Sequence, residues 1–406
     1  MKKGVRWLLT GIGLCLILAG CNDRRTIDLP MKSLFTLSIG KAEDELDLLE
    51  RPGVPSTYKT TLFMRDGLFY IANGEANKVM EFSSYGDILS LLYNPEDNPR
   101  PVLLTASASA GSLSTRVSHP YPFRRVGTVA VTQNKTVLVE DRVPEERQEY
   151  DKRLGAVLDG VVLRFSENGT LLDYLGQEGV GGTPFPYIVR LQTDSRGDII
   201  VITRVPKEWI VFWFSSSGEL LYRVDFAVND LPLPDKNHGY QGSLESVFAD
   251  PDKRLLYLKI DYYEPDVSGG GVRGNVDFAK SRVYWYSVES KEYEGHIDLP
   301  KHILEMSTGG FLDSQRVEVL YQLVGVASGG YMFLLSPLQN DYYELLIVGK
   351  NGMVVRRSRI ILDDKAIVLR RFFLTPSGIL CALLVHNFNA QVVWWRSDQL
   401  LSGELR

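Results

Sequence analysis

A turn pattern that recurs along the chain restricts the possible folds more than any other feature of the sequence. Each copy is a short polar segment that ends in glycine. It lies between two short runs in which apolar residues alternate as in a strand. This is the pattern of a β-hairpin, because glycine readily adopts the positive φ that tight turns require. The clearest copies are Phe82–Gly86, Phe165–Gly169, Phe214–Gly218 and Val348–Gly352. Two degenerate copies follow the same layout, at Tyr284–Lys291 and Val393–Asp398.

A second turn lies upstream of each of these hairpins. Its copies are Met64–Gly67, Thr132–Lys135, Thr193–Gly197, Asp250–Lys253, Ala327–Gly330 and Thr375–Gly378. Six copies of strand, turn, strand, loop, strand, turn, strand predict six four-stranded antiparallel units. No long stretch carries an apolar period of 3.6 residues, apart from a possible short helix near Pro300–Met306. Helices are therefore expected to be incidental.

Six four-stranded units predict an all-β fold, a six-bladed β-propeller. Each blade of such a ring buries both faces against its neighbours, so its strands can be almost entirely apolar. The apolar stretch Leu34–Ile39 belongs to no hairpin of its own. We expect it to pair into the last sheet and close the ring, which removes an exposed sheet edge.

One blade, at about residues 174–220, resembles the NHL-type propeller repeat. The resemblance lies in the glycine-rich loop Leu175–Pro186, the turn Asp194–Gly197 and the apolar strand Ile199–Val201. Blade 1 lacks the glycine-rich loop, and blades 2, 4 and 5 lack the full Asp-x-x-Gly turn. The resemblance implies a propeller, but the fold prediction rests on the six-fold pattern.

The N-terminus has the pattern of a signal peptide. Three basic residues precede the apolar run Trp7–Ala19, which is too short to span a bilayer. The run ends in Leu18–Cys21, which resembles the bacterial lipobox. This resemblance implies cleavage before Cys21 and a lipid on its thiol; an ordinary secretory peptide with a chance cysteine is the alternative. The predicted organisation is a signal peptide at 1–20, a lipidated tether at 21–33 and a propeller at 34–406.

Several functional classes find little support in the sequence. The net charge is −5 and no long basic run is present, which argues against nucleic acid as a partner. The five histidines show no metal-ligand spacing, and no nucleophile motif occurs. The sequence therefore assigns no catalytic residue, metal ligand or cofactor. A propeller hydrolase or lactonase with a metal in the central channel is kept as the alternative function.

The central channel is the first candidate for a binding site. Arginines lie near the predicted start of three inner strands and would favour a carboxylate or phosphate. They are Arg125, Arg190 and Arg371, and neighbouring aromatic candidates are Tyr121, Phe185 and Tyr187. A one-residue shift in register would turn each side chain to the opposite face. Solvated or blade-bridging arginines are therefore the competing interpretation.

Two insertions, at 144–153 and 266–279, are further candidates, because binding often lies on long loops. The combined prediction is an exported, lipid-anchored protein at the cell membrane or outer membrane, facing the periplasm or cell surface. It would act as a non-catalytic binding or scaffold propeller for an envelope protein, peptide or glycan. Membership of an envelope assembly complex is a third possibility.

Overall fold

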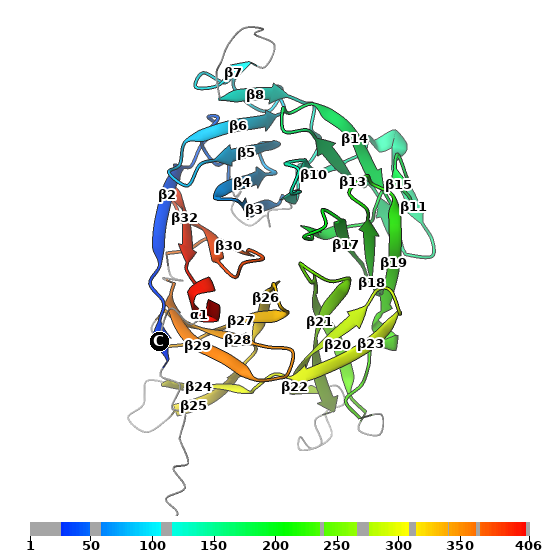
Figure 1. Ribbon diagram of the computed structural model, residues 1–406, viewed down its shortest axis with the longest axis vertical. Helices are drawn as coiled ribbons and strands as arrows, with labels where there is room; N and C mark the ends of the chain where they lie inside the picture. The colour runs from blue at the N-terminus through cyan, green and yellow to red at the C-terminus, as the bar shows by residue number, and fades with distance from the viewer. Residues whose placement is uncertain are drawn as a thin grey trace, which may run out of the picture.

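The computed structural model describes residues 26–48, 58–106, 116–235, 239–265, 276–307, 314–339, 341–362 and 366–402. Six sheets of four to six strands are arranged as a ring around a central axis (Figure 1). The predicted all-β, six-bladed β-propeller is confirmed. The predicted lipidation residue Cys21 and most of the glycine-rich insertion at 266–279 lie outside the described residues.

The first three blades follow one another along the chain, and each starts with its innermost strand. Blade 1 contains β3 (Thr60–Arg65), β4 (Leu68–Asn73), β5 (Lys78–Phe82) and β6 (Ile88–Tyr93). Blade 2 contains β9 (Val129–Val131), β10 (Val137–Arg142), β13 (Gly160–Phe165) and β14 (Leu171–Gly176). Blade 3 contains β16 (Ile188–Thr193), β17 (Ile199–Val205), β18 (Glu208–Phe214) and β19 (Leu220–Ala227).

The remaining blades complete the ring. Blade 4 contains β20 (Gln241–Ala249), β21 (Leu255–Pro265), β22 (Val276–Ser287) and β23 (Glu292–Asp298). Blade 5 contains β26 (Gln322–Ala327), β27 (Tyr331–Pro337), β28 (Tyr342–Val348) and β29 (Val354–Ile361). Blade 6 contains β30 (Leu369–Leu374), β31 (Leu380–Val385), β32 (Asn389–Trp395) and the N-terminal strand β2 (Lys32–Ser38).

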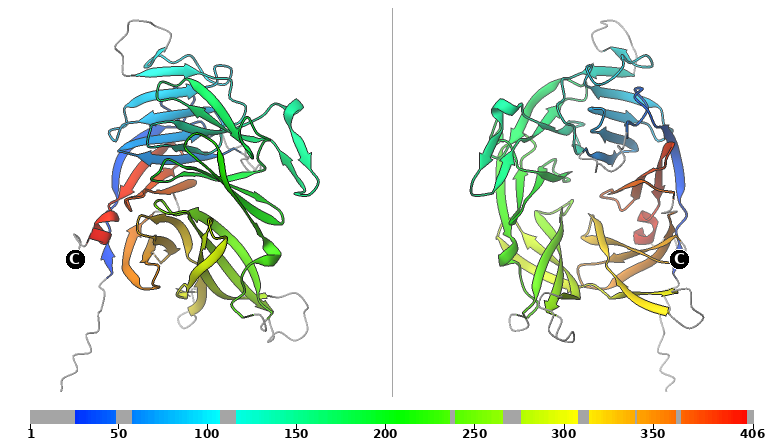
Figure 2. Two further views of the ribbon diagram at one scale, coloured as in Figure 1. Left: turned by 45° about the vertical axis from the view of Figure 1, so that its right-hand side comes forward. Right: turned by 180° about the vertical axis from the view of Figure 1, so that it is seen from behind.

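Short elements extend this framework. Blade 1 gains β8 (Val117–Pro120) and β7 (Thr105–Ala106), blade 2 gains β15 (Gly179–Val180), and blade 5 gains β1 (Ile27–Asp28). Two separate ribbons are formed by β11 (Glu149–Asp151) with β12 (Ala156–Leu158), and by β24 (His302–Ser307) with β25 (Ser314–Val319). The helical elements are η1 (Glu145–Arg147), η2 (Val228–Asp230) and α1 (Asp398–Ser402). The ribbon β11–β12 stands away from the ring (Figure 2).

The N-terminal strand closes the ring, as the sequence predicts. β2 pairs antiparallel with β32, so the first and last strands of the propeller share one sheet. Phe35 and Leu37 of β2 are buried in the apolar cluster between blades 6 and 1. The Phe35 ring packs against Phe69 and Phe82 of blade 1, with centroid distances of 5.7 and 5.4 Å. The closing strand therefore joins two blades.

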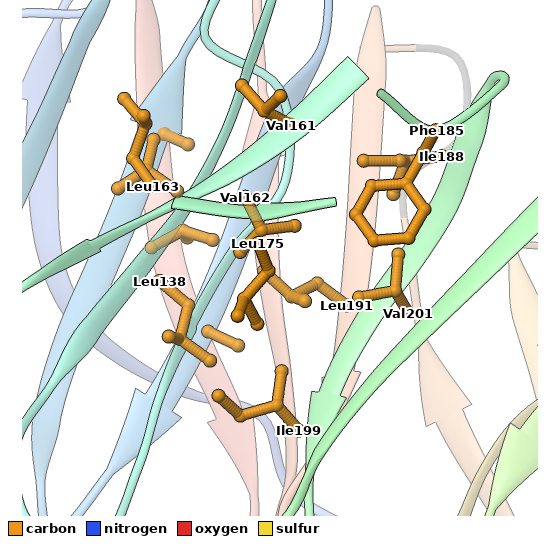
Figure 3. Close-up of a cluster of buried hydrophobic side chains, with 14 of the residues drawn as sticks. Leu138, Val161, Val162, Leu163, Leu175, Phe185, Ile188, Leu191, Ile199 and Val201 are labelled. Atoms are coloured by element: carbon orange, nitrogen blue, oxygen red, sulfur yellow. The ribbon is translucent and has the colours of Figure 1, made fainter. Parts of the chain in front are cut away.

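Apolar side chains fill every space between adjacent blades. One large cluster spans blades 1 to 3, and four others lie between blades 3 and 4, 4 and 5, 5 and 6, and 6 and 1. Between blades 2 and 3, Leu138 and Leu175 face Phe185 and Ile199 (Figure 3). Because both faces of a blade are buried, strands such as β13 are buried along their whole length.

Three local expectations differ from the structure. Pro300–Met306 contains strand β24 instead of a helix, since it pairs with β25 as a ribbon. In the sixth copy, the hairpin predicted at Val393–Asp398 does not form: α1 follows β32, because β2 already occupies the outer position of that blade. Part of the predicted tether at 21–33 lies on blade 5: β1 pairs with β29, and Asp28 forms an ion pair with Arg359 at 2.7 Å.

Replacing Phe35 with Ala tests the role of the closing strand. The substitution removes a buried ring that contacts blade 1, so we expect a loss of about 3–5 kcal/mol in the free energy of unfolding. Thr36→Ala is the matched control, because Thr36 is exposed on the opposite face of β2. Chemical denaturation of both variants measures the difference. Equal, small losses would show that β2 contributes little to ring stability.

Candidate ligand site in the central channel

The inner strands of the six blades surround a cavity of about 930 Å³. Residues from all six blades line it, and the inner strands β3, β16, β26 and β30 contribute most of them. A cavity of this size is in the range that holds small organic ligands in proteins. The channel is therefore the first candidate for a ligand site.

Bulges in three inner strands decide which side chains enter this cavity. In β16, β20 and β26 the register with the next strand shifts at one residue: Val189, Glu245 and Val324, respectively. A bulge places two residues opposite one and reverses the alternation of faces beyond it. Arg190 directly follows the bulge of β16 and lines the cavity.

The charged residues that line the cavity are all basic. They are Lys59, Arg190, Arg370 and Arg371. No carboxylate, imidazole or thiol occurs among the described residues of the lining. The channel therefore offers positive charge to a ligand but few groups that could hold a metal ion or act as a nucleophile.

Arg190 reaches from blade 3 to the adjacent blade 4 and has no charged partner among the described residues. Its guanidinium lies over the ring of Phe248 in blade 4, 3.7 Å from the centroid. The Nε atom is buried without a hydrogen-bond partner in the described structure. Burial alone lowers the pKa of Arg190 to about 10, so the side chain stays protonated at neutral pH.

Lys59 is neutralised where it enters the channel. Its Nζ lies 2.5 Å from Glu140 Oε1 of blade 2 and donates a hydrogen bond to the Ile188 carbonyl of blade 3, also at 2.5 Å. The same ammonium lies under the ring of Tyr187, 4.2 Å from the centroid. Lys59 therefore links three blades and adds little unbalanced charge.

Arg371 joins blade 6 to blade 1. Its Nε donates to the Thr60 carbonyl at 2.9 Å, and its Nη1 donates to the Arg370 carbonyl at 3.1 Å. Burial lowers the pKa of Arg371 below that of a free arginine. Arg370 in turn donates to the Tyr343 hydroxyl of blade 5 at 2.6 Å. The competing sequence interpretation, arginines that bridge blades, thus describes Arg371 well.

The structure brings together only part of the predicted site. Arg190, Arg371 and Tyr187 all line the cavity, and Tyr187 is 54% exposed. Arg125 does not line it; its guanidinium lies 4.9 Å from the ring centroid of Tyr58. We therefore keep Arg190, Arg371 and Tyr187 as channel residues.

The other two predicted aromatic residues pack in the apolar core of blades 1 to 3. Phe185 is fully buried against Phe212 and Phe214, and Tyr121 packs on Phe123 and Phe165. Neither lines the cavity. Phe248 is not recognisable as a site residue from the sequence, because nothing distinguishes it from the other apolar residues of its strand.

Comparison with known proteins gives only distant similarity. No protein-family model and no curated protein matches the sequence. Among solved structures, regucalcin from Agrobacterium tumefaciens, described as a calcium-binding protein, is 9% identical, with a TM-score of 0.36 over 92% of this chain and 96% of that one. The β-propeller domain of the trilobed protease from Pyrococcus furiosus is 8% identical, with a TM-score of 0.36 over 81% and 80%.

A third solved structure, the α-L-arabinofuranosidase Arb93A from Fusarium graminearum, is 10% identical, with a TM-score of 0.41 over 91% of this chain and 99% of that one. At such values these similarities do not bear on function. The six-bladed architecture rests on the strand pairing of this chain.

Other reactive groups are sparse in the described part of the chain. No cluster of three or more His, Cys, Asp or Glu side chains there could hold a metal ion. Cys381 is fully buried, and burial raises the pKa of its thiol to about 12, so the thiolate is scarce at neutral pH. No helix in the described ranges is long and apolar enough to cross a membrane.

The Lys59–Glu140 pair offers a test of how the channel is held together. Glu140→Ala leaves a largely buried ammonium without its carboxylate, so we expect a loss of about 3 kcal/mol in the free energy of unfolding. The control is Glu167→Ala, which breaks the Lys135–Glu167 pair of the same N–O distance on the surface of blade 2. Since exposed pairs contribute little, its denaturation midpoint should stay unchanged. A similar shift in both variants would contradict the bridging role of Lys59.

Proposed function

We propose that this protein is an exported, lipid-anchored binding protein of the cell envelope, and that its central channel holds the ligand. The observation that carries the proposal is the chemistry of the cavity. Its described lining combines basic and apolar side chains and contains no carboxylate, imidazole or thiol. Such a lining suits the recognition of an anionic ligand better than a chemical reaction.

The lipid anchor belongs to this proposal through Cys21. The described chain supports a close attachment, because Leu29 is buried against blades 5 and 6 and its N–H donates to the Arg359 carbonyl at 2.8 Å. A chain extends at most about 3.5 Å per residue, so the six steps from Cys21 to Ile27 reach about 20 Å. A lipidated Cys21 would thus hold blade 5 near the membrane surface.

A hydrolase or lactonase with a metal in the channel is the alternative function. Such a metal is usually held by several carboxylate or imidazole side chains that converge on it. The cavity lining, within the described ranges, provides only amide, hydroxyl and backbone oxygens. The binding function therefore has the better support.

Cys21→Ala tests the anchor. Without the thiol no acyl chain can be attached, and we expect the protein to leave the membrane fraction and to lose incorporation of a fatty-acid probe. Cys381→Ser is the control, because Cys381 is buried and should not be acylated. Membrane retention and probe incorporation in Cys21→Ala would contradict the lipoprotein assignment.

The binding function can be tested on protein from its native membrane. Native mass spectrometry should show a non-covalent ligand that is lost on unfolding, and elemental analysis should show no stoichiometric metal. Wild-type protein should also leave ester and lactone substrates intact. A stoichiometric divalent metal together with hydrolysis of such a substrate would favour the enzyme over the binding protein.

A further inference from the structure

We infer that the channel binds an organic acid, with its carboxylate on Arg190 and its apolar body against the channel wall. The inference rests on the proposed binding function and names the chemical class of the ligand. The ligand would be a carboxylate on an apolar body, either a small organic acid or the C-terminal end of a peptide.

The Arg190 guanidinium is available to a ligand. One face of its planar guanidinium is covered by Phe248, while the group lines the cavity. Among the described residues, its Nε atom has no hydrogen-bond partner and no carboxylate balances its charge. A guanidinium presents paired N–H donors in a plane, and a carboxylate matches this arrangement with two oxygens.

The other cations that line the channel already have partners within the protein. Lys59 is paired with Glu140, Arg371 donates to two backbone carbonyls, and Arg370 donates to Tyr343. These contacts join neighbouring blades. Arg190 is therefore the cation best placed to take up an external anion.

Apolar side chains form another part of the cavity wall. Several apolar side chains that line the cavity are only half-buried: Val189, Ile367, Phe372 and Phe373. Val368 is 50% exposed beside them. Contact with these surfaces would favour an apolar body, since burial of apolar area is worth roughly 25 cal/mol per Å².

The same observations disfavour a phosphate. Phosphate sites usually gather several donors or charges around three oxygens. Here only the Arg190 guanidinium faces the cavity without a charged or hydrogen-bonded partner among the described residues, since Lys59, Arg370 and Arg371 are already engaged by other residues. A carboxylate needs only one such group.

A pair of fluorescent probes separates the charge from the apolar body. Dansyl-phenylalanine carries a carboxylate, and dansyl-phenylalaninamide has the same body without the charge. We expect the acid to bind the wild-type mature protein at least tenfold more tightly than the amide. Arg190→Gln should weaken binding of the acid roughly ten- to hundredfold, as expected for a charge-assisted pair. Binding of the amide should change less than twofold.

Two further variants provide controls. Arg190→Lys keeps the charge but loses the planar donors, so its affinity for the acid should fall between those of wild type and Arg190→Gln. Arg204→Gln removes an exposed arginine that lies over Trp209 in the same blade, outside the cavity lining, and should bind both probes like wild type. Melting temperatures of all variants should agree, which shows that the ring is intact.

The outcomes are distinct. If both probes bind equally and Arg190→Gln changes neither, the channel binds apolar groups and the carboxylate site is refuted, while the binding function stands. If neither probe binds, the organic-acid site is refuted. If native protein also carries no ligand, the proposed function falls with it.

Competition identifies the source of the carboxylate. Octanoate represents a small organic acid, and a pentapeptide of alanine and valine with a free C-terminus represents a peptide end. Displacement by the free peptide but not by its amidated form, and not by octanoate, assigns the site to peptides. Displacement by octanoate alone assigns it to small acids. Failure of all three to displace the dansyl acid would refute the inferred ligand class.

Discussion

The pairing of β2 with β32 is the interaction on which the rest of this structure depends. It brings together residues that are more than 350 positions apart in the sequence, such as Phe35 and Val392. Without β2, blade 6 would have three strands and an open edge. Because each blade is buried on both faces by its neighbours, a gap at this interface would also expose the apolar cluster between blades 6 and 1.

Ring closure also creates the channel and sets the roles of the residues within it. The inner strand of blade 2, β9, has only three residues, and blades 1 and 3 reach each other across it. Lys59 donates to the Ile188 carbonyl, and Arg65 donates to Thr193 Oγ1 at 2.9 Å. Most channel cations thus stabilise the ring, whereas Arg190 has no charged partner among the described residues. The proposed binding would therefore rest on a different residue from those that hold the ring together.

The fold could be predicted from the sequence because its signals are local. A turn such as Phe214–Gly218 needs a glycine with positive φ, and Gly218 has φ 93°. The closing strand was predictable as well, since Leu34–Ile39 is apolar but has no hairpin partner nearby. The local pattern gave a wrong prediction at α1. A fourth strand was expected there, but β2 from the N-terminal region already fills that position in blade 6.

The candidate site could be predicted only in part, because its geometry depends on contacts between blades. Bulges at Val189 and Glu245 change which side chains of the inner strands point toward the channel. The residue types in these strands do not reveal the bulges. Phe185 has the aromatic character of a site residue, yet Phe212 and Phe214 enclose it. Arg190 and Phe248 come from two adjacent blades, and the periodicity of the sequence cannot show that they lie close together.

The proposed ligand site would hold a carboxylate on Arg190 in the central channel. A crystal structure of the mature protein soaked with 3-(4-bromophenyl)propionate tests it most directly, because anomalous scattering locates the bromine independently of the carboxylate density. We expect the carboxylate within hydrogen-bond distance of the Arg190 guanidinium and the bromine against the half-buried side chains of Phe372 and Phe373. Full occupancy elsewhere, or a bound molecule with its carboxylate turned away from Arg190, would contradict it.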